Sequence, residues 1–236
     1  ESKNGDYGAC VASIDWSTKV IFDELKDLGI DDNTLVIFTS DNGSRLQNQG
    51  GSNGNLRGRK GQTWDGGQRV PCIIRWPGKI KGGEETDALA TTMDFLPSIT
   101  NLIDGELPSK KIDGIDMSKL FFSNNNSSKR ESFLYYNEDE LEAIRHKNWK
   151  LHFKKEGKLI NELYDLENDI GEEVNLYNEN KEIVSELSIM ADGYRKSLGD
   201  KFFDIKGEEV RPAGRIIDPK PLTEFDENHP YMYAEY

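Results

Sequence analysis

The apolar, β-branched run from Leu35 to Ser40, which ends in Asp41-Asn42-Gly43, constrains the fold of this chain more than any other segment. Such a run predicts a buried strand, and open α/β sheets carry their binding groups at the ends of such strands. Adjacent strand residues point to opposite faces, so the backbone has to turn before Asp41 and Asn42 can reach one cation. Gly43 permits that turn. The two hard oxygen donors suit Ca²⁺ or Mg²⁺ and predict a metal site, although Asx-Gly also marks an ordinary tight turn.

A glycine-rich segment from Gly50 to Gly67 follows and carries Lys60. Gly58 and Gly61 let the backbone approach a ligand closely, and an ammonium is a compact charge for an anionic oxygen. The segment is not a P-loop, because that motif requires glycine directly before the lysine and Arg59 stands there. Lys60 is therefore a candidate for binding an anion beside the metal, and a solvated basic loop is the alternative.

The remaining polar residues offer weaker candidates. Arg69 is interpreted as a structural partner of a buried carboxylate such as Asp65. None of the three histidines, at positions 146, 152 and 229, lies near a nucleophile in the sequence, so each is interpreted as a core or surface residue. A serine hydrolase with a Gly-x-Ser-x-Gly elbow is excluded, because that motif does not occur.

Composition excludes two classes of partner. The 236 residues carry a formal net charge of -13, which argues against nucleic-acid binding because a basic face would be needed. No apolar stretch approaches the roughly 20 residues that span a bilayer. The two cysteines, Cys10 and Cys72, lie among apolar neighbours, so they are predicted to be buried free thiols.

The rest of the organisation follows from periodicity and turn residues. The pattern predicts helices over 11–28, 93–103 and 182–198, and strands over 70–76, 132–136, 142–153 and 163–166. A polar stretch at 123–128 predicts a boundary between one region at 1–128 and a second at 129–236, which ends in an extended tail from 210. Residues 1–128 supply only about two strands, which cannot close a parallel sheet, so we expect the missing strands to lie upstream of Glu1.

Several short motifs occur in a characteristic order and spacing. They are Tyr7-Gly8-Ala9-Cys10-Val11-Ala12-Ser13-Ile14-Asp15, Asn33 to Gly43, Leu56 to Pro71, Arg75-Trp76-Pro77-Gly78, Met93-Asp94-Phe95-Leu96-Pro97, Asp113-Gly114-Ile115-Asp116 and Glu162 to Asp169. Together they resemble the C-terminal half of a type I sulfatase, the formylglycine-dependent arylsulfatase family. The segment from Gln49 to Gly54 is similar to the arylsulfatase A and N-acetylgalactosamine-6-sulfatase branch.

The resemblance implies a fold and a site. The fold would be part of an alkaline-phosphatase-like α/β domain, followed by a small C-terminal α+β domain with an antiparallel sheet. Asp41 and Asn42 would be two ligands of a catalytic Ca²⁺, with Mg²⁺ as the alternative, and Lys60 would contact the substrate sulfate. In the family a hydrated formylglycine attacks sulfur while metal and lysine stabilise the sulfuryl oxygens.

The chain departs from the family where the nucleophile is concerned. It lacks the Cys/Ser-x-Pro-x-Arg motif, so formylglycine is expected only in an N-terminal half. It also carries Asp65 where relatives are expected to carry glutamate. The resemblance thus implies a sulfuric ester hydrolase for aryl or carbohydrate sulfates, represented by a part that is inactive alone.

Two other functions stay open on the sequence, a phosphomonoester or phosphonate hydrolase of the same superfamily and a non-catalytic binding module. The expected partners are a sulfated small molecule or glycan and the missing N-terminal half of the same protein. Self-association through an exposed sheet edge is also expected. The family resemblance implies a periplasmic or secreted location.

Overall fold

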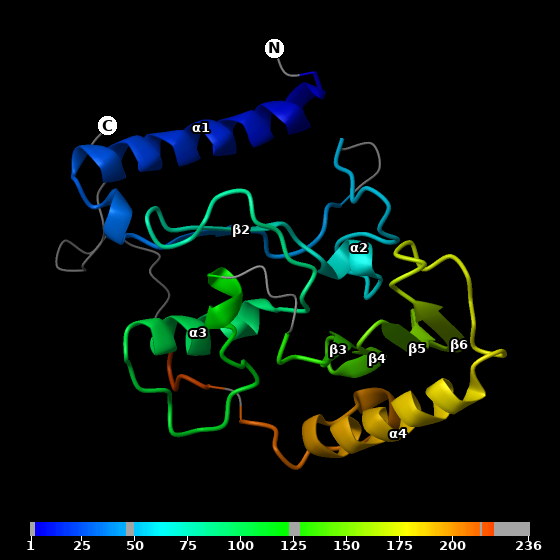
Figure 1. The fold of residues 1–236 in the computed structure, drawn as a ribbon. Helices are drawn as coiled ribbons and strands as arrows, with labels where there is room; N and C mark the ends of the chain where they lie inside the picture. The colour runs from blue at the N-terminus through cyan, green and yellow to red at the C-terminus, as the bar shows by residue number, and fades with distance from the viewer. Residues whose placement is uncertain (1–2, 46–49, 123–127, 213, 220–236) are drawn as a thin grey trace.

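The computed structural model describes residues 3–45, 50–122, 128–212 and 214–219 (Figure 1). Its helices are α1 (Gly5–Asp27), α2 (Asp65–Gln68), α3 (Phe95–Leu102) and α4 (Lys181–Leu198). Its strands are β1 (Val36–Thr39), β2 (Cys72–Arg75), β3 (Ser132–Asn137), β4 (Glu140–His146), β5 (Trp149–Lys155) and β6 (Lys158–Asp165). Among the described residues, no helix is both long enough and apolar enough to cross a membrane.

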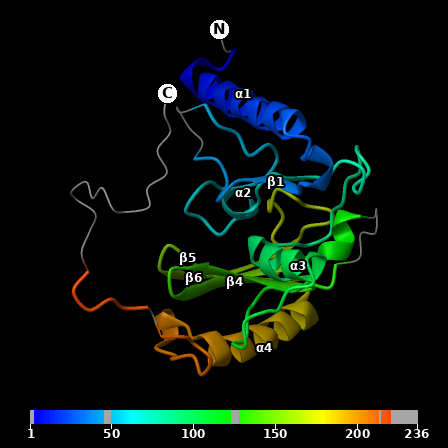
Figure 2. The same ribbon diagram turned by 90° about the vertical axis from the view of Figure 1, so that its left-hand side faces the viewer.

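Strands β3 to β6 form an antiparallel meander in chain order, and the sheet has two chemically different faces. Figure 1 and Figure 2 show α4 along one face and the segment around α2 over the other. The face toward α4 is apolar. Its core consists of Leu141, Ile144, Leu151, Leu163, Val184, Leu187 and Ala191. This core is the largest buried apolar cluster in the described part of the chain, so it holds the C-terminal region together.

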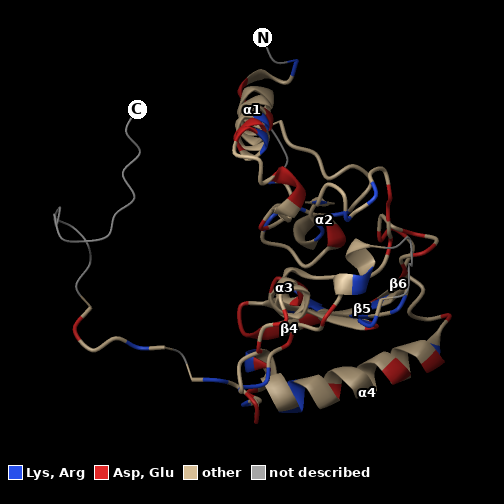
Figure 3. Ribbon diagram, turned by 60° about the vertical axis from the view of Figure 1, so that its left-hand side comes forward, with Lys and Arg blue, Asp and Glu red and all other residues tan. Residues whose placement is uncertain are grey.

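Helix α4 explains how the core closes. Val184, Leu187 and Ala191 recur three and four residues apart, so they lie on one side of the helix and face the sheet. Figure 3 marks acidic and basic residues along α4, and Glu182, Glu186 and Lys196 among them are exposed. The predicted helix over 182–198 is confirmed within one residue, although its buried stripe also uses Val184 and Ala191, which the sequence pattern did not select.

The predicted strands of this region are confirmed with one change. The segment 142–153 is not one strand but parts of β4 and β5, joined at a turn where Lys147 has a φ of 54°. Ala143 pairs with His152 and His146 with Trp149 across that turn. Asn148 is a turn-forming residue, but Lys147, which takes the positive φ, is not typical of that conformation, so the turn signal in the sequence was weak.

Strands β1 and β2 form a separate two-stranded sheet, and they run antiparallel. Strand β2 lies within the predicted strand at 70–76, and Pro71 directly precedes it, where a proline removes no hydrogen bond from the sheet. The prediction of a buried strand at 35–40 is wrong for the described residues, since Phe38 is exposed and its neighbours in β1 are only half-buried. An antiparallel pair without covering layers leaves apolar side chains at the surface.

Helix α1 confirms the predicted helix at 11–28 but contains no buried residue. Ile14, in the middle of its apolar stripe, is 52% exposed. For the same reason the prediction of buried thiols is wrong, because Cys10 on α1 and Cys72 on β2 are both exposed. The apolar sequence neighbours of these cysteines lie on elements that the described chain leaves uncovered.

Helix α3 confirms the predicted helix at 93–103 and shows how it is anchored. Asp94, directly before it, is buried and accepts hydrogen bonds from the backbone and side chain of Thr91 in a capping box. Arg130 binds both oxygens of the same carboxylate, with its Nη2 2.5 Å from Asp94 Oδ1. The predicted boundary at 123–128 falls mostly outside the described residues, as does the tail beyond 219.

Candidate functional site

The end of β1 and the loop that carries Lys60 are joined by backbone hydrogen bonds. The amide of Gly43 donates to the carbonyl of Gly67 at 3.1 Å, and the amide of Lys60 donates to the carbonyl of Ser44 at 3.1 Å. Asn53 adds a side-chain bridge, since its Oδ1 accepts from the amide of Ser44 at 2.8 Å. The structure therefore places the backbone of the two predicted site segments side by side.

Three glycines allow this close approach. A methyl group added at Gly43 would lie 1.8 Å from the carbonyl oxygen of Gly66. At Gly66 it would lie 2.5 Å from the carbonyl oxygen of Arg57, and at Gly67 it would lie 2.2 Å from that of Gln62. We call this contact of Gly43, Gly66 and Gly67 the glycine junction. Its backbone spacing excludes any side chain at these positions.

The side chains predicted to bind ligands are accessible. Asp41 and Lys60 are exposed and Asn42 is half-buried. No hydrogen bond or ion pair of these three side chains to another described residue is present. Their roles as metal ligands and as a sulfate-binding group stay predictions, because side-chain position alone does not identify a ligand.

The fit of a metal here rests on the chemistry of the donors. A carboxylate and an amide at one strand end are hard oxygen ligands, as Ca²⁺ and Mg²⁺ prefer. Within the described residues no group of three or more histidine, cysteine, aspartate or glutamate side chains is arranged to hold a metal ion. Asp41 and Asn42 thus fit a calcium site as part of its ligand set, and Ca²⁺ takes about 6–8 ligands.

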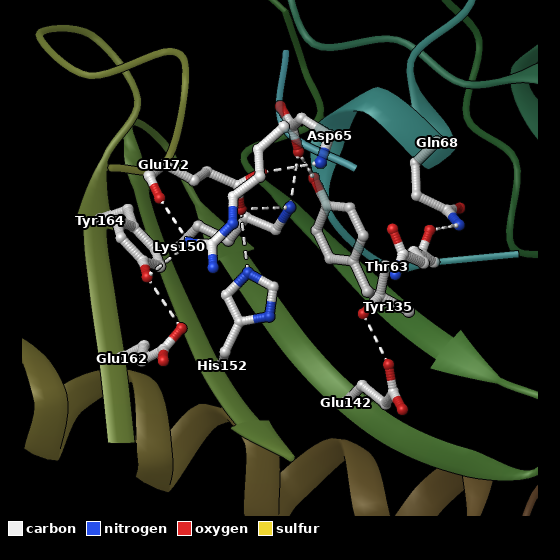
Figure 4. Close-up of polar contacts among 12 residues, drawn as sticks. Thr63, Asp65, Gln68, Tyr135, Glu142, Lys150, His152, Glu162, Tyr164 and Glu172 are labelled. Carbon is white, nitrogen blue, oxygen red and sulfur yellow. Dashed lines mark hydrogen bonds and ion pairs between the residues drawn. The ribbon is translucent and has the colours of Figure 1, made fainter. Parts of the chain in front are cut away.

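A buried polar cluster lies directly beneath α2, on the face of the sheet opposite α4 (Figure 4). Lys150 Nζ on β5 lies 2.7 Å from Asp65 Oδ1 and 2.8 Å from Glu172 Oε1, and all three side chains are 0% exposed. The hydroxyl of Tyr135 donates to the same Asp65 oxygen at 3.1 Å. The amide of Asp65 donates to Glu172 Oε2 at 2.8 Å. One ammonium is therefore shared by two carboxylates, both of which have further donors.

Burial determines the charge state of His152 in this cluster. Burial lowers the pKa of its imidazole well below the ordinary value, and the nearby Lys150 and Lys155 lower that pKa further. His152 is consequently neutral, and its Nε2 lies 2.9 Å from Glu172 Oε1. The interpretation of His152 as a core residue is confirmed.

A second set of contacts joins the lysine loop to the sheet through Thr63 and Trp64. Thr63 Oγ1 donates to Glu142 Oε2 at 2.6 Å. The Trp64 ring contacts the guanidinium of Arg57, 3.8 Å from its centroid, and the ammonium of Lys155, 4.4 Å from it. Both contacts are cation–π interactions, so two cations help to hold the residue that precedes α2.

Sequence reasoning found part of this arrangement. It paired Arg69 with Asp65, and their ion pair is present at 3.9 Å. It did not find Lys150 and Glu172, the main partners of Asp65. Lys150 follows Asp65 by 85 residues in the sequence, and no local spacing signals that contact. The strand alternates polar and apolar residues and also contains Lys154 and Lys155, so the sequence does not distinguish Lys150 from a solvated lysine.

Two family models match this chain. The sulfatase model matches residues 2–105, and the model of the N-sulphoglucosamine sulphohydrolase C-terminal region matches residues 59–195. The second covers more than half of the chain. The chain belongs to the sulfatase family.

Curated relatives agree with this assignment. The chain is 37% identical over 160 residues to steryl-sulfatase of Rattus norvegicus, which covers 64% of this chain and 27% of that protein. It is 33% identical over 201 residues to arylsulfatase A of Homo sapiens, which covers 74% of this chain and 39% of that protein. This sulfatase-family chain thus spans less than half the length of these relatives.

Solved structures confirm the predicted fold class. The crystal structure of Ps i-CgsB in complex with k-i-k-neocarrahexaose matches with a TM-score of 0.72 and 27% identity, over 82% of this chain and 44% of that one. The phosphonate monoester hydrolase of Agrobacterium radiobacter matches with a TM-score of 0.53 and 21% identity, over 78% of this chain and 39% of that one. The second likeness shows the fold alone.

Proposed function

We propose that this chain is the C-terminal part of a sulfuric ester hydrolase that acts on an aryl or carbohydrate sulfate. One observation carries the proposal. In a chain of the sulfatase family, the glycine junction joins the strand end bearing Asp41 and Asn42 to the loop bearing Lys60. The oligosaccharide bound to Ps i-CgsB supports a carbohydrate sulfate as one class of substrate.

The proposed roles follow from the charges of these groups. Asp41 and Asn42 would hold Ca²⁺, with Mg²⁺ as the alternative, and a bound divalent cation supplies Lewis-acid stabilisation of oxyanion charge. Lys60 would bind a sulfate oxygen as a point charge. The formylglycine nucleophile is expected in an N-terminal half, so the chain alone would bind sulfate but not hydrolyse its esters. A periplasmic or secreted location is proposed with this function.

The test compares two exposed lysines in a longer protein that joins this chain to an N-terminal half. Lys60→Ala should lower kcat/KM for an aryl sulfate by about 10²–10³, the effect of removing one oxyanion-stabilising donor. Lys110→Ala, which removes an exposed lysine elsewhere, should leave that rate unchanged. The chain 1–236 alone should release no product above its Lys60→Ala variant.

The outcomes separate the alternatives. Equal rates for the wild-type protein and Lys60→Ala would contradict the role of this lysine. Faster hydrolysis of an aryl phosphate than of the matching aryl sulfate would favour the phosphomonoester or phosphonate hydrolase. Absence of hydrolysis by the longer protein, together with retained glycan binding, would favour the non-catalytic module.

A further inference from the structure

Lys150 lies beneath the glycine junction although it is far from Lys60 in the sequence. Its ammonium binds Asp65, the first residue of α2, and Gly66 and Gly67 follow directly. Gly67 accepts the hydrogen bond from Gly43, and Gly66 donates to the carbonyl of Arg57 at 2.7 Å. An uninterrupted set of contacts therefore runs from the C-terminal sheet to both predicted site segments.

The junction has no side chains of its own to hold it. Gly43, Gly66 and Gly67 have no side chains, so they contribute backbone hydrogen bonds and no apolar packing of their own. Glycine also has the largest conformational freedom to lose on ordering. The nearest strong anchor is the buried carboxylate of Asp65, whose oxygen Oδ1 accepts from both Lys150 and Tyr135.

We propose that Lys150 is a positioning residue that holds the glycine junction, and thereby the backbone that carries Asp41, Asn42 and Lys60, through its ion pair with Asp65. The inference rests on the proposed function only for what those three side chains bind. The C-terminal sheet thus contributes to the site through the geometry of the Lys60 loop.

Charge explains why this lysine, among the buried groups, has that effect. Without its ammonium, the carboxylates of Asp65 and Glu172 would share a fully buried space with no cation bound to both. A buried carboxylate that loses its partner is strongly destabilised. Relief comes from uptake of a proton by one of the carboxylates or from movement of α2 away from the sheet, and that movement would carry Gly66 and Gly67 with it.

Amide hydrogen exchange in the chain 1–236 tests this directly. Lys150→Met keeps the length of the side chain and removes the charge. The amides of Gly43 and Lys60, which report the two hydrogen bonds of the site, should exchange about tenfold faster or more, whereas amides of α4 should change much less. A general structural role would accelerate all of these amides by the same factor, and that result would overturn the proposal.

Lys154→Met is the matched control. Lys154 is also buried on β5, but its ammonium lies over the ring of Phe202 and pairs with Glu140, away from α2. Its loss should leave exchange at Gly43 and Lys60 unchanged relative to α4. An acceleration at these amides equal to that in Lys150→Met would overturn the proposal.

Tyr135→Phe tests the same positioning through Asp65 if Lys150→Met does not fold. It removes one hydrogen bond to the same oxygen of Asp65 and leaves every charge paired. Exchange at Gly43 and Lys60 should rise about fivefold, as expected for one hydrogen bond. No change at these amides, or a uniform change over the chain, would overturn the proposal.

Titration with inorganic sulfate separates this inference from the proposed function. If Lys60→Ala does not weaken sulfate binding, the proposed role of Lys60 fails. The exchange experiment involves no ligand, so a selective effect of Lys150→Met would still support the positioning role. Selective sulfate binding through Lys60 with exchange unaffected by Lys150→Met would overturn the positioning role alone.

Discussion

The two regions of this sulfatase-family chain bury their apolar side chains very differently. In the region of β3 to β6 and α4, Leu163 is 0% exposed and belongs to a closed core between sheet and helix. In the region of α1, β1 and β2, no residue of α1 is buried, and Ile73 on β2 is 62% exposed. The first region is stabilised by its own core, whereas the second presents apolar surface.

The candidate site lies where these regions meet. Thr63, Trp64 and Asp65 directly precede Gly66 and Gly67 of the glycine junction. All three are buried against the C-terminal sheet. The Lys60 loop therefore takes its stability from the sheet that follows it in the sequence.

Removal of core volume should have the largest effect. Leu163→Ala should lower the free energy of unfolding by about 2–5 kcal/mol, since it deletes a fully buried side chain. Ile14→Ala on α1 should change it by less than about 0.5 kcal/mol. Urea unfolding followed by circular dichroism measures both, and similar losses would show that α1 is packed in solution.

Substitution in the glycine junction should have the second-largest effect on the free energy of unfolding. Gly66→Ala places a methyl group 2.5–2.8 Å from three carbonyl oxygens, so the free energy of unfolding should fall by about 1–3 kcal/mol. Gly82→Ala is the control, because nothing lies within 4 Å of the added methyl. Urea unfolding of both variants is the measurement, and equal stability would refute the tight backbone contact.

A pH dependence should follow from Lys155. Burial lowers the pKa of its ammonium to about 8, although Glu142 opposes the shift. Between that pH and the ordinary value of 10.5, the unfolded chain binds the proton and the folded chain does not. Stability should therefore rise as the pH increases from 8 to 10, by about 1 kcal/mol per unit relative to Lys155→Met. Urea unfolding of the wild type and of Lys155→Met at several pH values measures this difference. The same change of unfolding free energy with pH in both proteins would contradict the lowered pKa of Lys155.

A substitution on the exposed β1–β2 sheet should have the smallest effect on stability, but it should change self-association of the chain. Phe38 and Ile73 are exposed partners on the β1–β2 sheet. Phe38→Lys should change the free energy of unfolding by about 0.5 kcal/mol or less, but it should reduce self-association of the chain. Sedimentation velocity measures the latter. A monodisperse wild-type monomer would contradict the expected self-association.

The elements that sequence reasoning placed correctly have strong local signals. The helix at 182–198 has a clear apolar period, and Pro71 marked the start of β2. The pair of Arg69 and Asp65 could be predicted because the two residues are four apart in the sequence. Local spacing was sufficient in each case.

The failures have non-local causes. Burial of Cys10 and of the strand at 35–40 depends on layers that the described chain does not contain. The triad of Asp65, Lys150 and Glu172 depends on contacts across 85 and 107 residues. A buried lysine is chemically indistinguishable in the sequence from a solvated one, so only the assembled sheet reveals its partners.

The irregular register of β5 between His152 and Lys154 determines which of the two neighbouring lysines, Lys154 or Lys155, faces which side of the sheet. Lys154 lies over the ring of Phe202, whereas Lys155 lies over that of Trp64 on the other side of the sheet. Strict alternation through this stretch would exchange the two environments. The register of β5 is therefore as constrained as its composition: a regular strand of the same length would turn the ammonium of Lys155 toward α4 and leave Glu142 without that counter-charge.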